Sequence, residues 1–346
     1  MRRLRTFTAV LLAAGLIAAG CTSSKSTTPD GGKSLDKVTY VTGFGSFGRE
    51  AYAWYGKDKG FFKDEGIDLT IVPGAGGNQN LQYFKTNRAQ FTAIDYSGAI
   101  VDVGKGEDDF KVISAIHQRT LIAIMALDNS KSKISTPQSL QGKKIGVATG
   151  AVPKTLFPAY AKLAGIPNPK SVQFLDSNPQ QLPGLLAAGQ VDAIGQFVVG
   201  APSVIAAATA AHVTDPKVVT LPYSQFMTDL YGNVLIAPTS LISSNPDLVR
   251  RFNRAYLKSL AASSADPEGT GAALAKDVPT QKAAPATAEV KLMAPYVGEA
   301  ATVGTMDATN VARGIALLQG TGLIPASFDP NKLVAFDFVP KGSAAK

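Results

Sequence analysis

The chain has 346 residues, enough for two domains with a sizeable core, which excludes a short peptide module. Hydrophobic residues make up 45% and charged residues 17%, a globular composition rather than a disordered or coiled-coil one. The net charge of +8 on its own would suit a nucleic-acid or membrane surface. A single cysteine excludes an intramolecular disulfide, and two histidines cannot supply the remaining ligands of a zinc site.

The first twenty residues have the pattern of a secretory signal peptide. Three arginines precede the uncharged stretch 6–20, which is too short for a comfortable bilayer-spanning helix and ends in small residues. We therefore predict that residues 1–20 are a cleaved signal peptide. Its removal takes three of the positive charges away, and no later basic run interleaves with aromatic residues. We accordingly predict no nucleic-acid partner.

The only cysteine follows this segment directly. Residues 18–21, Ala-Ala-Gly-Cys, resemble the processing box of bacterial lipoproteins, whose cysteine becomes the lipidated first residue of the mature protein. We predict lipidation at Cys21 and a flexible tether over residues 21–35, which are rich in Ser, Thr, Gly and Pro. The protein would then be anchored at the extracytoplasmic face of the bacterial cell membrane. An ordinary secretory signal with an incidental cysteine is the alternative.

From residue 38 onward, short apolar runs with strand character alternate with longer helical stretches. The predicted strands are 38–42, 67–72, 91–95, 111–116, 121–127, 143–149, 171–176, 192–197, 217–221 and 233–238. The predicted helices are 49–62, 79–86, 154–164, 180–188, 201–211, 246–263, 288–296 and 307–321. This alternation predicts an α/β fold around a largely parallel sheet. The polar stretch 128–141, with a possible one-turn helix at its end, is where we expect the chain to cross into a second α/β block.

Gly43, Gly45 and Gly48 form a G-x-G-x-x-G motif between a predicted strand and a predicted helix, which is the local context of dinucleotide binding. A nicotinamide-dependent oxidoreductase is therefore an alternative from another class. The second strand, however, ends in Val72-Pro73-Gly74 without the acidic residue that binds the ribose. The glycines are better explained by tight turns and close packing. Because no catalytic constellation or metal-ligand cluster is present in the sequence, we predict neither an enzyme, nor a cofactor, nor a metal site.

Ligands of open parallel sheets bind beyond the carboxyl ends of the strands, where loops deliver helix N-termini. The candidate ligand-binding residues from these loops are Phe44, Ser46, Phe47, Arg49, Gly76, Gly77, Asn78, Asp95, Tyr96, Gln118, Thr149, Gly150, Ala151, Gln196 and Phe197. Asp95 could equally be a helix cap, and Asn178 is expected to be a plain cap. Tyr52, Trp54 and Tyr55 are expected in the core, although one of them could floor a cleft.

Several stretches in chain order resemble one known family. They are Ala51 to Val72 (AYAWYGKDKGFFKDEGIDLTIV), Gly74 to Asn78 (GAGGN), Ala89 to Phe91 with Asp95, Leu140 to Val147 (LQGKKIGV) and Leu185 to Ala193 (LLAAGQVDA). In this order they resemble the solute-binding proteins of ABC importers that handle alkanesulfonates, nitrate and pyrimidine precursors of thiamine, with riboflavin binders among the relatives. The resemblance covers most of the mature chain.

The resemblance implies a two-lobed periplasmic-binding-protein-like fold of type II, with a ligand cleft between lobes joined by a two-strand hinge. Lobe 1 would be residues 36–128 plus 229–340, and lobe 2 residues 129–228, with a tail at 341–346. The implied partners are a small-molecule solute, an ABC permease with its ATPase subunits, and the membrane through the lipid anchor. We expect a monomer that closes on its solute without making or breaking a bond.

The loop residues favour a planar heterocycle, such as a pyrimidine thiamine precursor or a flavin, because aromatic rings and amides can stack on it and hydrogen-bond to it. Relatives that bind pyrimidine precursors often carry an acid beside an aromatic residue where this chain has Gln196-Phe197. An alkanesulfonate, nitrate or bicarbonate is the alternative, since Arg49 and the glycine loop could donate to an anion.

Overall fold

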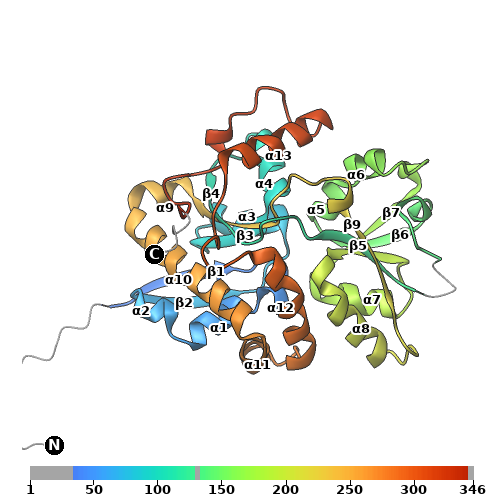
Figure 1. Cartoon of the computed structure of the whole chain (residues 1–346), viewed down its shortest axis with the longest axis horizontal. Helices are drawn as coiled ribbons and strands as arrows, with labels where there is room; N and C mark the ends of the chain where they lie inside the picture. The colour runs from blue at the N-terminus through green and yellow to red at the C-terminus, as the bar shows by residue number, and fades with distance from the viewer. Residues whose placement is uncertain (1–33, 129–132, 342–346) are drawn as a thin grey trace, which may run out of the picture. The chain divides into compact units, whose positions relative to one another are not determined.

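The computed structural model describes residues 34–128 and 133–341, and these contain two five-stranded sheets (Figure 1). The first sheet has the order β2-β1-β3-β10-β4. Its strands are β1 (Asp36–Val41), β2 (Ile67–Val72), β3 (Phe91–Asp95), β4 (Phe110–Ala115) and β10 (Asn233–Pro238). The second sheet has the order β7-β6-β8-β5-β9. Its strands are β5 (Ile122–Leu127), β6 (Lys144–Ala148), β7 (Gln173–Ser177), β8 (Ala193–Phe197) and β9 (Val218–Pro222).

Each sheet contains one reversed strand. In the first sheet β1 pairs in parallel with β2 and β3, whereas β10 is antiparallel to both β3 and β4. In the second sheet β6 pairs in parallel with β7 and β8, whereas β5 is antiparallel to both β8 and β9. The predicted α/β class is confirmed, and the largely parallel sheet that we expected is two sheets with one reversed strand each.

The chain passes between the sheets twice. It leaves the first sheet after β4 and enters the second at β5, then returns after β9 and enters β10. The two connections are hydrogen-bonded to each other, with Thr120 N donating to Leu230 O at 2.7 Å and Gly232 N donating to His117 O at 3.0 Å. These paired connections form the expected two-strand hinge.

The expected position of the first crossing is wrong. We placed it at residues 128–141, but β5 already belongs to the second sheet, so the crossing lies between Ala115 and Ile122. The apolar run of β5 predicts a buried strand correctly, since all six of its residues are buried. Apolar composition says nothing about which neighbours a strand pairs with, and here the neighbours are β8 and β9.

Thirteen α-helices surround the two sheets in the described part of the chain. They are α1 (Tyr52–Asp58), α2 (Phe61–Asp64), α3 (Gly77–Lys85), α4 (Tyr96–Gly104), α5 (Val152–Thr155), α6 (Phe157–Leu163), α7 (Leu182–Ala187), α8 (Ala201–Ala210), α9 (Thr239–Ser244), α10 (Pro246–Ala265), α11 (Pro267–Asp277), α12 (Ala283–Val297) and α13 (Ala308–Gly320). Short 3-10 turns are η1 (Gly48–Glu50), η2 (Pro137–Leu140), η3 (Pro169–Ser171), η4 (Pro179–Gln181), η5 (Val198–Gly200), η6 (Tyr223–Gln225) and η7 (Pro330–Lys332). Helices α4, α9 and α11 were not predicted.

We call the first sheet with α1–α4 and α9–α13 lobe 1, and the second sheet with α5–α8 lobe 2. Figure 1 shows α7 and α8 on one side of the second sheet and α5 and α6 on the other. The long helix α10 begins as its sequence predicts, because Asn245 caps it by accepting a hydrogen bond from Leu248 N at 3.1 Å and Pro246 occupies its first position. Its apolar face packs on α1 and α2 of lobe 1.

The core of lobe 1 is aromatic and partly polar. The ring of Phe91 on β3 stacks on Phe252 of α10 with centroids 3.8 Å apart. The hydroxyls of Tyr40, Tyr52 and Tyr256 form a triangle with O–O distances of 2.8, 2.8 and 3.2 Å. Tyr52 thus belongs to the core, as expected.

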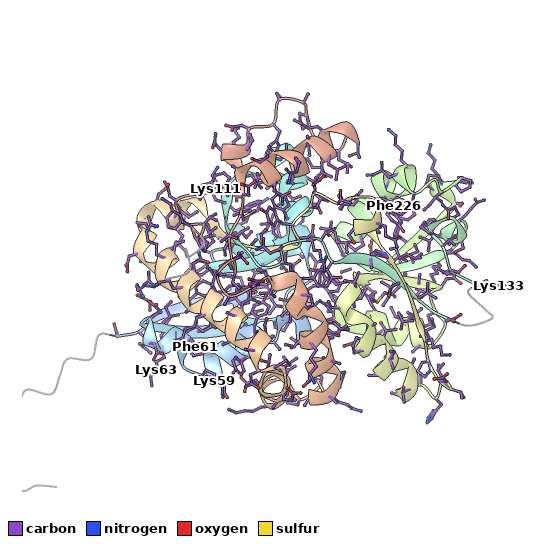
Figure 2. The ribbon with its side chains drawn as sticks, viewed as in Figure 1. Lys59, Phe61, Lys63, Lys111, Lys133 and Phe226 are labelled. Atoms are coloured by element: carbon purple, nitrogen blue, oxygen red, sulfur yellow. The ribbon has the colours of Figure 1, made fainter. Side chains whose placement is uncertain are left out.

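The α1–α2 corner shows how this core meets the surface. Phe62 is buried, while the side chains of Lys59 and Lys63 point into solvent (Figure 2). Neighbouring Phe61 is half-buried, with the Lys258 ammonium 4.3 Å from its ring centroid.

No helix of the described residues is long and apolar enough to cross a bilayer. The predicted signal peptide, Cys21 and nearly all of the predicted tether lie outside the described residues.

Candidate functional site

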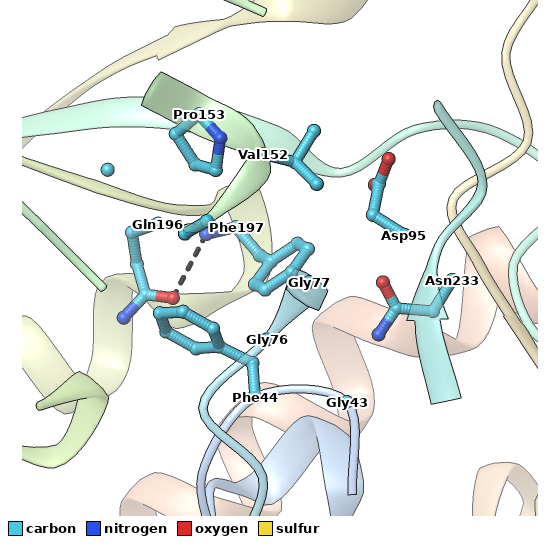
Figure 3. A pocket seen from close by; sticks show the side chains of 12 residues that line it. Gly43, Phe44, Gly76, Gly77, Asp95, Val152, Pro153, Gln196, Phe197 and Asn233 are labelled. Carbon is cyan, nitrogen blue, oxygen red and sulfur yellow. Dashed lines mark hydrogen bonds between the residues drawn. The ribbon is translucent and has the colours of Figure 1, made fainter. Parts of the chain in front are cut away.

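A pocket lies between the two lobes, at the ends of their strands (Figure 3). Lobe 1 contributes the loop after β1, the start of α3, the last residue of β3 and the first residue of β10. Lobe 2 contributes the start of α5 and the end of β8. The lining residues are Gly43, Phe44, Gly76, Gly77, Asp95, Ala151, Val152, Pro153, Gly195, Gln196, Phe197 and Asn233.

The walls are aromatic and aliphatic, and they lie close together. Phe44 of lobe 1 meets Phe197 of lobe 2 edge to face, with ring centroids 5.5 Å apart (Figure 3). The space that the centre of a water molecule can occupy inside the pocket is about 20 Å³. That volume suffices for about one ordered water, so a larger molecule enters only when the lobes separate or the rings turn.

Three buried polar side chains belong to the lining residues, and each has one polar atom without a partner. The Asp95 carboxylate accepts hydrogen bonds through Oδ1 from Ser97 N at 2.9 Å and Gly98 N at 3.3 Å, while Oδ2 has no partner among the described residues. Gln196 accepts from Phe197 N at 3.0 Å, and within the same part of the chain its Nε2 is unpaired. Asn233 Oδ1 is likewise unpaired there. Unpaired buried polar atoms are costly, and a molecule in this space could supply the missing partners.

Burial raises the pKa of Asp95 to about 6, against the lowering effect of its hydrogen bonds from Ser97 and Gly98. The twelve lining residues include this one carboxyl group and no lysine or arginine. The pocket therefore favours hydrogen-bond donors and positive charge over anions.

Asn80, which the sequence analysis missed, builds the wall that α3 provides. Its Nδ2 donates to the carbonyls of Thr42, Gly43 and Ala93, and its Oδ1 accepts from Ala75 N and Gly76 N, all at 2.9 to 3.2 Å. One fully buried amide thus ties the glycine loop to the ends of β1 and β3. A buried asparagine one turn into a helix carries no local sequence signal for this role.

Seven of the fifteen predicted ligand-binding residues line the pocket. They are Phe44, Gly76, Gly77, Asp95, Ala151, Gln196 and Phe197. Asp95 caps α4 through one oxygen and is also a lining residue of the pocket, so its cap role is confirmed and its ligand role stays a prediction. Gly76 and Gly77 have φ of 87° and 47°, so glycine permits this turn at little steric cost.

The other predicted residues lie elsewhere. Tyr96 is buried edge-on against Tyr231, and Gln118 donates to the carbonyl of Thr305 at 3.3 Å. The Asn78 amide, oriented with its nitrogen toward Asp102, lies 3.0 and 3.1 Å from the carboxylate oxygens. A position just after a strand does not by itself show whether a side chain turns toward the pocket.

Ser46 is buried outside the lining, and Thr149 and Gly150 are exposed. Phe47 and Arg49 belong to a neighbouring buried cluster that borders the pocket without lining it. All of these residues follow a strand as predicted, but none of them lines the pocket.

The structure also decides the residues whose roles were left open. Asn178 is a cap, accepting from Gln180 N at 3.0 Å. Trp54 and Tyr55 are buried like Tyr52, and none of the three lines the pocket, so the idea that one floors the cleft is wrong.

Gly195 and Asn233 were not predicted from the sequence, and Gly43 was considered only as part of the glycine motif. Asn233 was missed because it begins the reversed strand β10, whose first residue lies beside the last residue of β3. The rule that sites lie at carboxyl ends of strands therefore overlooks it.

Gly45 and Gly48 have packing roles. Gly45 has φ of 71° and donates its N–H to Gly74 O at 2.7 Å. A Cβ on Gly48 would lie 2.3 Å from the carbonyl oxygen of Ala286, so this glycine lets helix α12 pack closely against the loop after β1. In the described residues no group of three or more His, Cys, Asp or Glu side chains could hold a metal ion.

Comparisons with known proteins agree with this architecture. A family model described as NMT1/THI5 like matches residues 51–270. No match was found among curated proteins.

Three similar solved structures have the same fold. The alkanesulfonate-binding protein SsuA from Xanthomonas axonopodis pv. citri, bound to MOPS, is 16% identical, with 89% of this chain and 98% of that chain covered and a TM-score of 0.66. The periplasmic nitrate-binding protein NrtA from Synechocystis PCC 6803 is 11% identical, with 88% and 87% covered and a TM-score of 0.68. The ligand-binding component of an ABC-type import system from Staphylococcus aureus, with zinc bound, is 14% identical, with 90% and 99% covered and a TM-score of 0.63. These likenesses confirm the two-lobed periplasmic-binding-protein-like fold.

Proposed function

This chain belongs to the NMT1/THI5-like family, whose family model matches residues 51–270, and we propose that it is the solute-binding component of an ABC importer. In this role it captures a small molecule between its lobes and delivers it to a permease, whose ATPase subunits supply the energy. The protein itself makes and breaks no bond. The names of the similar structures, which bind sulfonate, nitrate or zinc, support an import role and do not agree on one solute.

The observation that carries the proposal is the composition of the pocket. Two lobes joined by paired connections contribute to one small apolar space, and three of its lining residues each have a buried polar atom without a partner among the described residues. A solute that contacts both lobes stabilises the closed arrangement over the open one by the contacts that only closure completes. Pockets between lobes are common sites for such molecules.

We further propose that the solute is a planar heterocycle bearing N–H donors, such as an aminopyrimidine related to a thiamine precursor, or a flavin. Phe44 and Phe197 offer aromatic surfaces, Asp95 Oδ2 and Asn233 Oδ1 accept hydrogen bonds, and Gln196 Nε2 donates one. An anion such as a sulfonate, nitrate or bicarbonate would meet a carboxyl group and no lining cation.

A melting screen of the purified protein tests both levels of this proposal. A ligand at a hundred times its dissociation constant adds about 2.7 kcal/mol, which corresponds to a rise in Tm of about 3–5 °C for a protein of this size. We expect 4-aminopyrimidines or riboflavin to produce this rise, and ethanesulfonate, nitrate and bicarbonate to leave Tm unchanged.

The variant Phe197→Ala should lose the response. The control Phe61→Ala, which removes a half-buried ring outside the pocket, should keep it. A rise with an anion alone would replace the solute class and retain the role. A response to a nicotinamide cofactor alone would favour the oxidoreductase alternative, and no response to any compound would contradict the binding role.

For its location we propose that residues 1–20 are a signal peptide, that Cys21 is acylated and that residues 21–35 tether a monomer to the extracytoplasmic face of the cell membrane. The Ala-Ala-Gly-Cys pattern supports this. Substitution Cys21→Ser should move the protein from the membrane fraction to the soluble fraction in cell fractionation. If the variant stays with the membrane, the anchor lies elsewhere.

A further inference from the structure

A buried cation lies beside the pocket without lining it. The Arg49 side chain is 1% exposed, and its guanidinium carbon lies 4.5 Å from the ring centroid of Phe47, 4.8 Å from that of Phe197 and 5.3 Å from that of Phe44. Its Nη2 donates to the carbonyl of Phe44 at 3.3 Å. Three rings from the protein thus surround the charge, two from lobe 1 and one from lobe 2, and cation–π attraction holds them together.

The counter-ion of Arg49 is Glu289 on α12, which is fully buried. Glu289 Oε2 lies 3.7 Å from Arg49 Nη1 and accepts a hydrogen bond from Arg49 N at 3.2 Å. Helix α12 packs on η1, α10 and α11 of lobe 1, and it also contacts α8 and η5 of lobe 2. The ion pair therefore lies within lobe 1 at the face that lobe 2 covers.

Lobe 2 closes over this ion pair with two side chains. The ring of Phe197 contacts both Arg49 and Phe44. The hydroxyl of Ser203 on α8 donates a hydrogen bond to Glu289 Oε1. Closing the lobes removes two charges from water, which is costly unless hydrogen bonds and close packing compensate the lost hydration. The Ser203 hydroxyl and the Phe197 ring provide part of this compensation, and only in the closed arrangement, while Arg49 Nε and Nη1 have no hydrogen-bond partner among the described residues.

The cluster formed by Arg49, Glu289, Ser203 and the three rings around Arg49 separates two cavities. Phe44 and Phe197 line the inner pocket, whereas Phe47 and Ser203 line an outer hollow, together with residues of α7, α8 and the start of α12. In the outer hollow the centre of a water molecule can occupy about 300 Å³, compared with about 20 Å³ in the inner pocket. The cluster is the boundary between them.

We propose that Arg49 and Glu289 of lobe 1, with Phe197 and Ser203 of lobe 2, form a latch that sets the balance between closed and open lobes. Arg49 then acts as a positioning residue for Phe44 and Phe197 instead of binding an anionic solute. The importance of the latch for solute capture rests on the function proposed above, because a solute binds more weakly when its closed form is less populated. The existence of the latch does not depend on that function.

The test measures lobe separation in the full chain without any added ligand. In a Cys21→Ser background, spin labels are placed at Lys57→Cys in lobe 1 and Lys170→Cys in lobe 2, which are both exposed. Electron–electron resonance then gives the distribution of distances between the labels. The test variant is Ser203→Ala, and the control is Ser264→Ala, another half-buried helical serine, whose hydroxyl bonds to Leu260 O at 3.1 Å within its own helix.

We expect Ser203→Ala to lower the ratio of closed to open molecules about tenfold, as for loss of a hydrogen bond to a charged group, and Ser264→Ala to leave it unchanged. Glu289→Gln, which keeps the side-chain shape and removes the charge, should shift the ratio in the same direction. Equal distributions for Ser203→Ala and Ser264→Ala would overturn the latch. So would a ligand-free wild type that is as open as the variants. A failed melting screen, by contrast, would contradict the proposed function and leave these distances unaffected.

Discussion

The two lobes share one strand order, yet they differ in what they bury. Among the described residues from β5 to β9, Gln196 is the one buried polar or charged side chain other than tyrosine. Lobe 1, in contrast, buries many, including Arg49, Glu50, Asp95, Asn233 and Glu289. Lobe 2 presents Val152, Pro153 and Phe197 to the pocket. The polar groups of the pocket are thus concentrated in lobe 1, and lobe 2 supplies mainly apolar side chains.

This difference bears on stability as well as on binding. A buried polar group must keep its partners or lose stability, so the polar lobe is the more sensitive to substitution. A cover of apolar side chains and rings can move away and return without leaving many unpaired groups. We therefore expect lobe 1 to hold its structure while lobe 2 moves relative to it. Three predictions follow the contrast from its largest expected effect to its smallest.

The largest effect is expected at Asn80. Substitution Asn80→Ala removes five hydrogen bonds at a fully buried position and leaves several backbone groups unpaired, so the free energy of unfolding should fall by about 3 kcal/mol. Denaturant titration followed by circular dichroism measures this change. The control Asn310→Ala, at a half-buried helical position, should cost less than about 1 kcal/mol. Equal losses in the two variants would mean that the glycine loop does not depend on Asn80.

The second effect concerns Asp95 and depends on pH. Burial raises its folded-state pKa from the ordinary 3.8 to about 6, so the folded protein holds this proton more tightly than the unfolded chain. Burial of Asp95 therefore does not lower the free energy of unfolding below about pH 4, where the group is protonated in both states. It lowers this free energy by its full amount above about pH 7. Asp95→Asn should raise the free energy of unfolding by about 2 kcal/mol at pH 8 and leave it unchanged at pH 4.

The same Asp95→Asn variant should lose most of its response to the stabilising compound, because the acceptor in the pocket becomes an amide. Asp102→Asn is the matched control, since burial also raises the pKa of Asp102 to about 6 and this residue does not line the pocket. Asp102→Asn should leave the compound's effect on Tm unchanged. Binding that survives Asp95→Asn in full would place the recognition groups elsewhere.

The smallest effect compares one buried tyrosine hydroxyl in each lobe. Tyr256 bonds to the hydroxyls of Tyr40 and Tyr52 in lobe 1, whereas Tyr223 donates to Pro153 O at 2.8 Å in lobe 2. We expect Tyr256→Phe to cost about 2 kcal/mol and Tyr223→Phe about 1 kcal/mol, because two bonds are lost in the first case and one in the second. Chemical denaturation of both variants checks the order. A larger loss for Tyr223→Phe would remove the contrast between the lobes.

Much of the fold could be predicted from local pattern. Every predicted strand has a counterpart, and β2 and β3 begin and end at the expected residues because turn-forming or polar residues flank their apolar runs. The Asn-Pro start of α10 also behaves as its sequence indicates. Helices α9 and α11 were missed because small and polar residues dominate them and their apolar spacing is weak.

The site was half predicted, for a related reason. The rule that sites lie at carboxyl ends of strands correctly locates Phe44 in the loop after β1 and Asp95 and Phe197 at the ends of β3 and β8, since strand direction places those ends together. Arg49 illustrates the limit of that rule. Arg49 follows β1, as Phe44 does. It is held beside the pocket by the carboxylate of Glu289, 240 positions later in the chain, and by rings from both lobes. Long-range partners of this kind leave no trace in local spacing.

By itself the sequence determined the α/β class, the ten strands of the described residues and the loops that can reach a site, because apolar periodicity, caps and turn residues act over a few neighbouring residues. Only the tertiary structure decided that β5 crosses early into the second sheet, that Asn233 of the reversed strand joins the pocket and that Arg49 is enclosed by three rings. Those features arise from the pairing of strands and the burial of charge between distant segments, and their free energies exist only once the lobes are assembled.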